Sequence, residues 1–296
     1  GQESQYLQER RRALGGYVPH RIVKARPLEA VPLEFFAEFF EATGECTAAT
    51  TMAMVRMLQR LMNHERIGKL IVPIVPDEAR TFGMDALFRK FGIYSRLGQQ
   101  YEPADSDVVL YYREAKDGQV LEEGITETGS MASFIAAATS YATHAQPMIP
   151  FYVFYSMFGF QRTGDQMWAA GDQMSRGFVL GATAGRTTLN GEGLQHEDGH
   201  SHLHAMTVPS VRAYDVSFAF ELAAIIEDGL KRMRLNPADV KYVLITHGHS
   251  DHDEGATYFQ QKYGARVMLG AGDWGLIENA RRPMPGGTPK REVVAE

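Results

Sequence analysis

Short apolar runs alternate along the chain with longer segments in which apolar residues recur at helical spacing. Four runs have the length and composition of buried strands: Lys69–Val75, Asp107–Tyr112, Met148–Tyr155 and Phe178–Leu180. Helices are predicted over six segments: Glu3–Leu14, Leu33–Ala42, Thr47–Asn63, Gly129–Thr143, Phe160–Gln173 and Ser217–Met233. Apolar strands that alternate with helices favour an α/β fold, in which a parallel sheet is flanked by helices.

A polar loop follows the last of these strands. Residues 187–204 read TTLNGEGLQHEDGHSHLH and contain four histidines among acidic, amide and glycine residues. Ligands of parallel α/β sheets bind at the carboxyl ends of the strands, so Asp77, the region of Phe158 and the loop around His196 should lie along one edge. Two alternatives stay open: plain solvated surface, or a metal site formed by the histidines, whose spacing matches no standard zinc pattern.

The composition narrows the class of protein. The chain has 296 residues, of which 44% are hydrophobic, and this is ample for a buried core. A net charge of −6 without a basic run argues against a nucleic-acid partner, and no apolar run reaches the length of a membrane helix. The single cysteine, Cys46, fits a reducing cytoplasm. The N-terminus lacks an initiator Met and a signal peptide, so we expect the interior of a longer protein.

Three stretches together resemble one enzyme family. They read VPIVPDEARTFGMDALFRKFGIYS, EEGITETGSMASFIAAATSYATHAQPMIPFYVFYSMFGFQRTGDQMWAAGDQMSRGF and GRTTLNGEGLQHEDGHSH. They resemble the homodimeric, acetyl-transferring pyruvate dehydrogenases, and the similarity extends over residues 5–233. It implies a helical connector at residues 1–45, followed at residues 46–233 by the middle domain, which holds the aminopyrimidine ring of thiamine diphosphate. It also implies a cytoplasmic enzyme that is a homodimer in its parent form.

The resemblance assigns the central catalytic role to Glu127, in the motif GITETG. In this family a carboxyl group on the aminopyrimidine ring promotes the proton transfer that activates the thiazolium carbon. That carbon attacks pyruvate, and the acetyl group passes to a lipoyl domain of the acyltransferase subunit. Without the resemblance, Glu127 would be one of many exposed acids.

Further residues match positions around the cofactor and the substrate. Phe158 matches the aromatic residue that packs on the pyrimidine, with Tyr155 close by, although aromatic residues in an apolar run are usually core. Asp77 and Glu78 match acids near the cofactor, with a helix N-cap as the alternative. Two further matches are loop residues that face the substrate, where a histidine could position pyruvate or carry a proton: Glu192 and His196.

The chain also departs from a complete thiamine enzyme. It contains no GDG motif, which begins the module that holds Mg²⁺ and the diphosphate, and the family's C-terminal domain is absent. In such enzymes the pyrimidine and diphosphate modules that face each other come from different subunits. The resemblance therefore implies half a cofactor site, and we expect little decarboxylase activity from the isolated chain.

The pattern changes after Met233. A strand is predicted at Lys241–Ile245, then a helix that ends near Tyr263, then a strand at Arg266–Leu269. The intervening HGHSDH resembles the metallo-β-lactamase superfamily signature, and residues 234–296 would form a small β-α-β piece of its αββα fold. The resemblance implies Zn²⁺ ligands at four positions: His247, His249, Asp251 and His252.

This tail is incomplete as a metallohydrolase. No histidine follows His252, and Glu254 stands where a small residue is common. Partial zinc binding is plausible and hydrolysis is not expected. Three functional classes follow: a fragment of a thiamine-dependent pyruvate dehydrogenase, which we favour, a zinc hydrolase, and a non-catalytic chimeric remnant whose join lies near Met233.

Overall fold

The chain divides into two units, Gly1–Met233 and Arg234–Glu296. The computed structural model describes residues 2–13, 25–28, 31–45, 48–104, 112–183, 193–233, 242–244, 260–262 and 264–268. Among these residues no helix is both long enough and apolar enough to cross a membrane.

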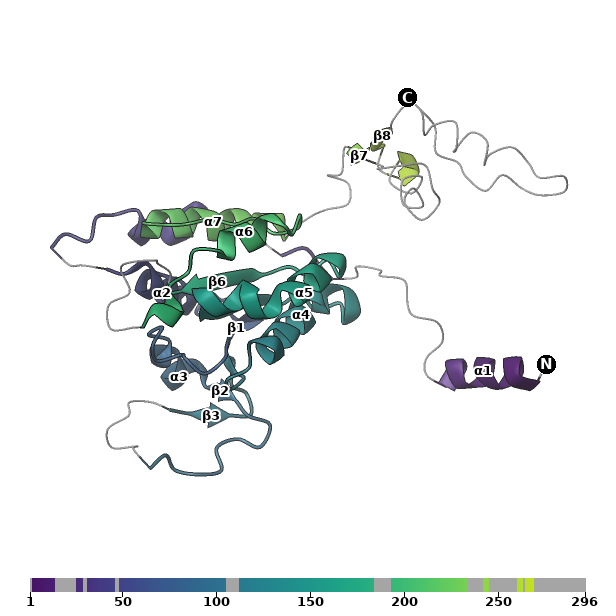
Figure 1. The fold of residues 1–296 in the computed structure, drawn as a ribbon, viewed down its shortest axis with the longest axis horizontal. Coiled ribbons are helices and arrows are strands. Elements are labelled where there is room, and N and C mark those ends of the chain that lie inside the picture. The colour runs from purple at the N-terminus through teal and green to yellow at the C-terminus, as the bar shows by residue number, and fades with distance from the viewer. Residues whose placement is uncertain are drawn as a thin grey trace. The chain divides into compact units, whose positions relative to one another are not determined.

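A four-stranded parallel sheet forms the centre of the first unit (Figure 1). Its strand order is β4-β1-β5-β6. The strands are β1 (Ile71–Val75), β4 (Leu121–Glu122), β5 (Ile149–Tyr155) and β6 (Phe178–Ala182). Every residue of β1 is buried, as are the first six of β5, which explains why their sequences are nearly continuous apolar runs. The predicted α/β fold with a parallel sheet is confirmed.

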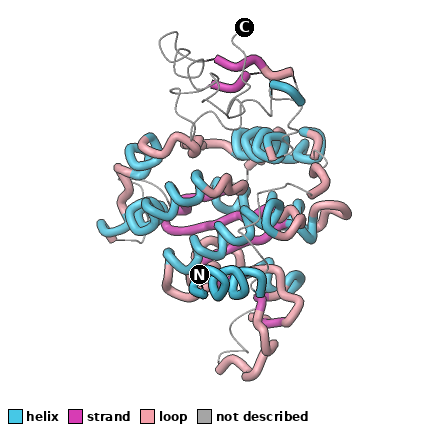
Figure 2. The backbone as a smooth tube through the Cα atoms, turned by 90° about the vertical axis from the view of Figure 1, so that its right-hand side faces the viewer, coloured by secondary structure: helices cyan, strands magenta, loops and turns pink. Residues whose placement is uncertain are grey.

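Helices cover both faces of the sheet (Figure 2), and each face has its own core. On one face, Ile71 and Phe151 pack with residues of η1 (Leu33–Phe39), α2 (Thr50–Met62) and α7 (Ala219–Arg232). On the other, Ile74 and Tyr152 pack against α4 (Glu127–Thr143) and α5 (Gly159–Asp172). The side chains alternate between the two cores because successive strand residues point to opposite faces.

Most of the predicted helices are present. The helix α1 spans Gln2–Ala13, and the predicted methionine-rich stripe of α2 is core, since Met54, Leu58 and Met62 are all buried. The segment that begins at Leu33 is a 3₁₀-helix rather than the predicted α-helix, and it ends at Phe39. Its tighter winding turns Phe36 and Phe39 into the core from consecutive turns.

Several short elements had no periodic signal. They are η2 (Gly68–Leu70), α3 (Asp85–Phe91), β2 (Ile93–Tyr94), β3 (Glu114–Ala115), η3 (Ser156–Phe158), η4 (Leu194–His196) and α6 (Ser201–Met206). Strands β2 and β3 pair in parallel as a separate sheet. Of the predicted strand at Asp107–Tyr112, residues 107–111 lie outside the described residues, and Tyr112 belongs to no strand.

In the second unit, β7 (Tyr242–Leu244) pairs in parallel with β8 (Arg266–Met268). Residues 260–262, between them, are helical. The strands predicted at Lys241–Ile245 and Arg266–Leu269 are therefore present in part, and most of the predicted helix between them lies outside the described residues. The four predicted zinc ligands, His247, His249, Asp251 and His252, lie outside the described residues.

Candidate functional site

The carboxyl ends of the sheet strands bring together residues from distant parts of the chain. Asp77 follows β1, Glu127 begins α4 five residues after β4, and Phe158 follows β5. All four strands are parallel, so these ends lie at the same edge. His196 contacts this edge from the loop after β6. The predicted edge therefore exists.

At its centre is a continuous series of contacts, which we term the edge array: Glu127, Arg162, Phe158, His196 and Tyr155. The Arg162 guanidinium forms an ion pair with Glu127 and lies over the Phe158 ring, 4.1 Å from its centroid. The His196 ring lies 5.4 Å from Phe158 and 4.6 Å from Tyr155, measured between centroids. Four of the predicted site residues thus meet, joined by an arginine that the sequence did not single out.

Glu127 is held in place by the start of α4. Thr126 is the N-cap, and its hydroxyl accepts a hydrogen bond from the Gly129 amide at 3.1 Å. Only 8% of Glu127 is exposed. The hydroxyl of Tyr152, in β5, donates to the Glu127 carbonyl at 3.1 Å, and burial, followed by the charge of Glu127, raises the pKa of Tyr152 above its ordinary range. Glu127 is thus a nearly buried carboxylate at the start of α4, and it is paired with Arg162.

Hydrogen bonds connect the loop that carries His196 with Ser156, the residue directly after β5. The Ser156 hydroxyl donates to Asp198, and the Ser201 hydroxyl donates to the Ser156 carbonyl at 3.0 Å. The other oxygen of Asp198 accepts from the amides of His200 and Ser201, both at 3.0 Å. Burial by itself would raise the pKa of Asp198, but these hydrogen bonds outweigh it and lower the pKa to about 2.

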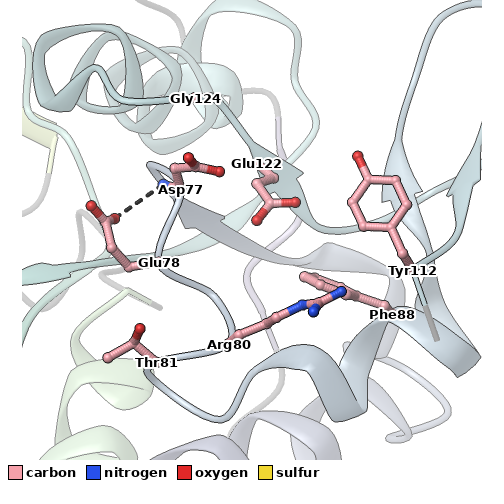
Figure 3. Close-up of a pocket in the computed structure, with 8 residues that line it drawn as sticks. All are labelled: Asp77, Glu78, Arg80, Thr81, Phe88, Tyr112, Glu122 and Gly124. Atoms are coloured by element: carbon pink, nitrogen blue, oxygen red, sulfur yellow. Dashed lines mark hydrogen bonds between the residues drawn. The ribbon is translucent and has the colours of Figure 1, made fainter. Parts of the chain in front are cut away.

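A cavity of about 410 Å³ opens beside β1 and β4 (Figure 3). Its lining combines acidic, basic, hydroxyl and aromatic groups: Asp77, Glu78, Arg80, Thr81, Phe88, Tyr112, Glu122 and Gly124. Both predicted acids that follow β1, Asp77 and Glu78, therefore line the cavity. Neither caps a helix, since the next helix, α3, begins at Asp85 with Met84 as its N-cap.

Glu122 is the most perturbed acid of this cavity. Burial, then repulsion from Asp77, raises the pKa of Glu122 from 4.5 to about 7, against an opposing contribution from Arg80. Burial, together with hydrogen bonds to Tyr101 and Glu114, also raises the pKa of Tyr112 above its ordinary range. A carboxyl group that changes charge near neutral pH marks this cavity as a candidate part of the site.

The histidine-rich loop matches neither of the two alternatives left open by the sequence, a plain solvated surface or a metal site. His202 and His204 are exposed, but His196 and His200 are partly buried, so the loop is not plain solvated surface. The rings of His200 and His204 lie 5.3 Å apart between centroids, but the described residues contain no group of three His, Cys, Asp or Glu side chains able to hold a metal ion. Glu192, the other predicted loop residue, lies outside the described residues.

Sequence reasoning missed three residues of this edge. Arg162 lies one turn into α5, and Ser156 is a small polar residue at the end of an aromatic strand. Glu122 ends a strand of only two residues. Each acquires its role from a contact with a residue far along the chain, which no local pattern records. The local signal for Ser156 and Arg162 was that both are polar residues within a few positions of Phe158.

The fold and the edge array define an α/β domain whose parallel sheet presents a buried acid, a cation and two aromatic rings at its carboxyl edge. Residues 34–252 match the family described as the pyruvate dehydrogenase E1 component middle domain. The chain belongs to this family, as the sequence resemblance predicts. The matched region runs beyond Met233 and through residue 252.

The relatives carry the same name in several bacteria. The pyruvate dehydrogenase E1 component of Pseudomonas aeruginosa is 57% identical over 242 residues, 82% of this chain and 27% of the relative. That of Haemophilus influenzae is 59% identical over 246 residues, 82% of the chain and 28% of the relative. That of Cupriavidus necator is 49% identical over 300 residues, 99% of the chain and 33% of the relative. The chain thus spans about a third of these relatives or less, and the matches give no support to a metallo-β-lactamase fusion.

Proposed function

We propose that this chain supplies the aminopyrimidine-binding half of a thiamine-diphosphate site in a pyruvate dehydrogenase. The observation that carries the proposal is the edge array, in which Glu127, Phe158, Tyr155 and His196 form one connected group. Family membership supports the same interpretation.

The donor set fits an aminopyrimidine. Such a ring is flat, aromatic and polar along its nitrogen edge, so it needs an apolar surface and a hydrogen-bonding partner. Phe158 and Tyr155 are only partly buried and offer ring surface at the strand end, while Glu127 offers carboxylate oxygens beside them. One acid among aromatic side chains matches this requirement.

When bound, thiamine diphosphate supplies a nucleophilic carbon for the decarboxylation of a 2-oxo acid. Glu127 would hold a ring nitrogen and exchange a proton with it, and Phe158 with Tyr155 would fix the plane of the ring. Arg162 neutralises Glu127 and keeps its carboxylate oriented. His196, on the aromatic pair, would orient the carboxylate of pyruvate, with Glu192 in the same loop.

Other parts of the site would come from outside this chain. The sequence contains no GDG motif, so the diphosphate and Mg²⁺ would be held by another segment or subunit. We propose that the parent enzyme is a homodimer, which would bring the two half-sites together. Asp77 and Glu78 would face the cofactor region from the cavity, and a lipoyl domain of the acyltransferase would accept the acetyl group.

Ligand binding tests the aminopyrimidine half directly. The chain would be titrated with 4-amino-2-methylpyrimidine and followed by NMR, since a half-site should bind weakly. We expect shifts of the Phe158 and His196 ring resonances in the wild type and their loss in Glu127→Gln. Glu123→Gln is the matched control, because it removes a neighbouring carboxylate outside the edge array. Equal binding by both variants would contradict the assigned role of Glu127.

For the tail, zinc binding by residues 247–252 stays a second proposal. It is supported by the HGHSDH spacing and by β7, whose last residue, Leu244, precedes the motif. Zinc would be measured on the whole chain after dialysis, with the double variant His247→Ala and His249→Ala as control. Loss of bound zinc in the double variant supports a site, and no zinc in the wild type ends the proposal.

A further inference from the structure

We propose that Asp198 and Ser156 are positioning residues, whose hydrogen bond holds the His196 loop against Tyr155 and Phe158. The inference rests on the proposed function for the importance of His196, but the contact itself can be tested without any cofactor. Nothing in the sequence pattern pairs these two residues, which are separated by 42 positions.

The geometry joins two short segments at their functional residues. Ser156 directly follows Tyr155 and lies two positions before Phe158, and Asp198 lies two positions after His196. A hydrogen bond between Ser156 and Asp198 therefore fixes the imidazole relative to both aromatic rings. Direct contacts between η3 and η4 run alongside it.

The two carboxylate oxygens of Asp198 bind different segments, one Ser156 and the other the start of α6. Its Oδ2 accepts from Ser156, while its Oδ1 accepts from the amides of His200 and Ser201 at the start of α6. Only 8% of its side chain is exposed. Hydrogen bonds to a shielded carboxylate are stronger than those between neutral groups, so the junction can define the position of the loop.

A reciprocal bond closes the junction. The Ser201 hydroxyl donates to the Ser156 carbonyl at 3.0 Å, so the same serine is contacted through its side chain and its backbone. Removing the Ser156 hydroxyl deletes the bond to Asp198 and leaves the Asp198 bonds within α6 in place. Ser156→Ala is therefore the variant that separates positioning of the loop from formation of α6.

The experiment observes His196 in the whole chain by NMR, using ¹³C-labelled histidine. The ten histidines of the chain give a small set of signals, and the signal that disappears in His196→Gln is assigned to His196. In the wild type its ring signals should differ from those of exposed His202, because two aromatic rings lie within 5.4 Å. Thr207→Ala is the matched control, since it removes a hydrogen bond at the other end of α6.

We expect Ser156→Ala to move the His196 signals toward those of His202, and Thr207→Ala to leave them unchanged. Asp198→Ala should do the same as Ser156→Ala and should also speed exchange of the Ser201 amide by roughly tenfold or more. Wild-type His196 signals in a folded Ser156→Ala variant would overturn the proposal. If Ser156→Ala loses its native circular dichroism, a folded Asp198→Ala variant decides in the same way, because alanine removes both oxygens that bind Ser156 and the loop amides.

The outcome is independent of thiamine. If the pyrimidine fails to bind but His196 moves in Ser156→Ala, the positioning role stands and the proposed function fails. If the pyrimidine binds and His196 does not move, the proposed function stands and the positioning role fails.

Discussion

Replacing Glu122 with glutamine should change how stability depends on pH. Glu122 ends β4 and lines the cavity with Asp77 and Glu78. Burial, then repulsion from Asp77, raises its pKa from 4.5 to about 7. Between these pH values the folded protein keeps a proton that the unfolded chain has released, so the free energy of unfolding falls as pH rises through this window.

The magnitude follows from the two pKa values. Their difference corresponds to about 3 kcal/mol, and the partial exposure of Glu122 reduces this to about 1–2 kcal/mol by solvent screening. Glutamine stays neutral at every pH. The Glu122→Gln variant should therefore match the wild type below pH 4.5 and exceed its free energy of unfolding by about 1–2 kcal/mol at pH 8.

Urea denaturation at pH 4.5, 6 and 8 measures this difference, with fixed ionic strength because the cavity holds several charges. The matched control is Glu123→Gln, which removes a carboxylate from the same segment outside the cavity lining. The reasoning is refuted if Glu122→Gln is less stable than the wild type at pH 8, or if its stability falls with pH as steeply as that of the wild type.

Two further substitutions test the packing around the edge array. Gly159→Ala would drive a methyl group into the Phe154 ring and should lower the free energy of unfolding by about 1–3 kcal/mol. The control, Gly164→Ala, places its methyl group in open space on the same helix and should raise the free energy of unfolding slightly. Equal effects of the two substitutions would contradict the packing around Gly159. Arg162→Met removes the cation beside buried Glu127 and should cost about 1–2 kcal/mol in urea denaturation, with an unchanged midpoint as the contrary result.

The long elements could be predicted because their burial leaves a periodic signal. β1 and β5 are buried on both faces, so their sequences are apolar runs, and α2 displays its core stripe at helical spacing. Because the strands were predicted to be parallel, the sequence also predicted that Asp77, Phe158 and the His196 loop lie at one edge of the sheet. Here hydrophobic burial alone determines the pattern.

The short elements could not be predicted, because tertiary contacts form them. α6 has six residues, three of them polar, and the Asp198 oxygen caps its first amides from outside the helix. β4 has two residues, which is too short for any period. The 3₁₀-helix at Leu33–Phe39 was predicted as an α-helix, because apolar residues three positions apart suit both kinds of helix.

The residues of the candidate site likewise include some that the sequence identified and some that only the structure reveals. The resemblance supplied Glu127, Phe158, Tyr155 and His196, and the structure joins them into one array. Arg162 and Ser156 could not be found from the sequence, because their partners lie 35 and 42 positions away. A single polar side chain has no periodicity, so only the folded chain reveals its partner.

The central claim is that Glu127 performs proton exchange in a thiamine site, and a segment exchange tests it most directly. The aligned 242 residues of the Pseudomonas aeruginosa relative would be replaced by those of this chain, and pyruvate decarboxylation would be measured with thiamine diphosphate and Mg²⁺. We predict activity in the exchanged enzyme, a loss of at least about 100-fold with Glu127→Gln, and little change with Glu123→Gln. Full activity with Glu127→Gln, in an enzyme that otherwise requires thiamine diphosphate, would contradict the account.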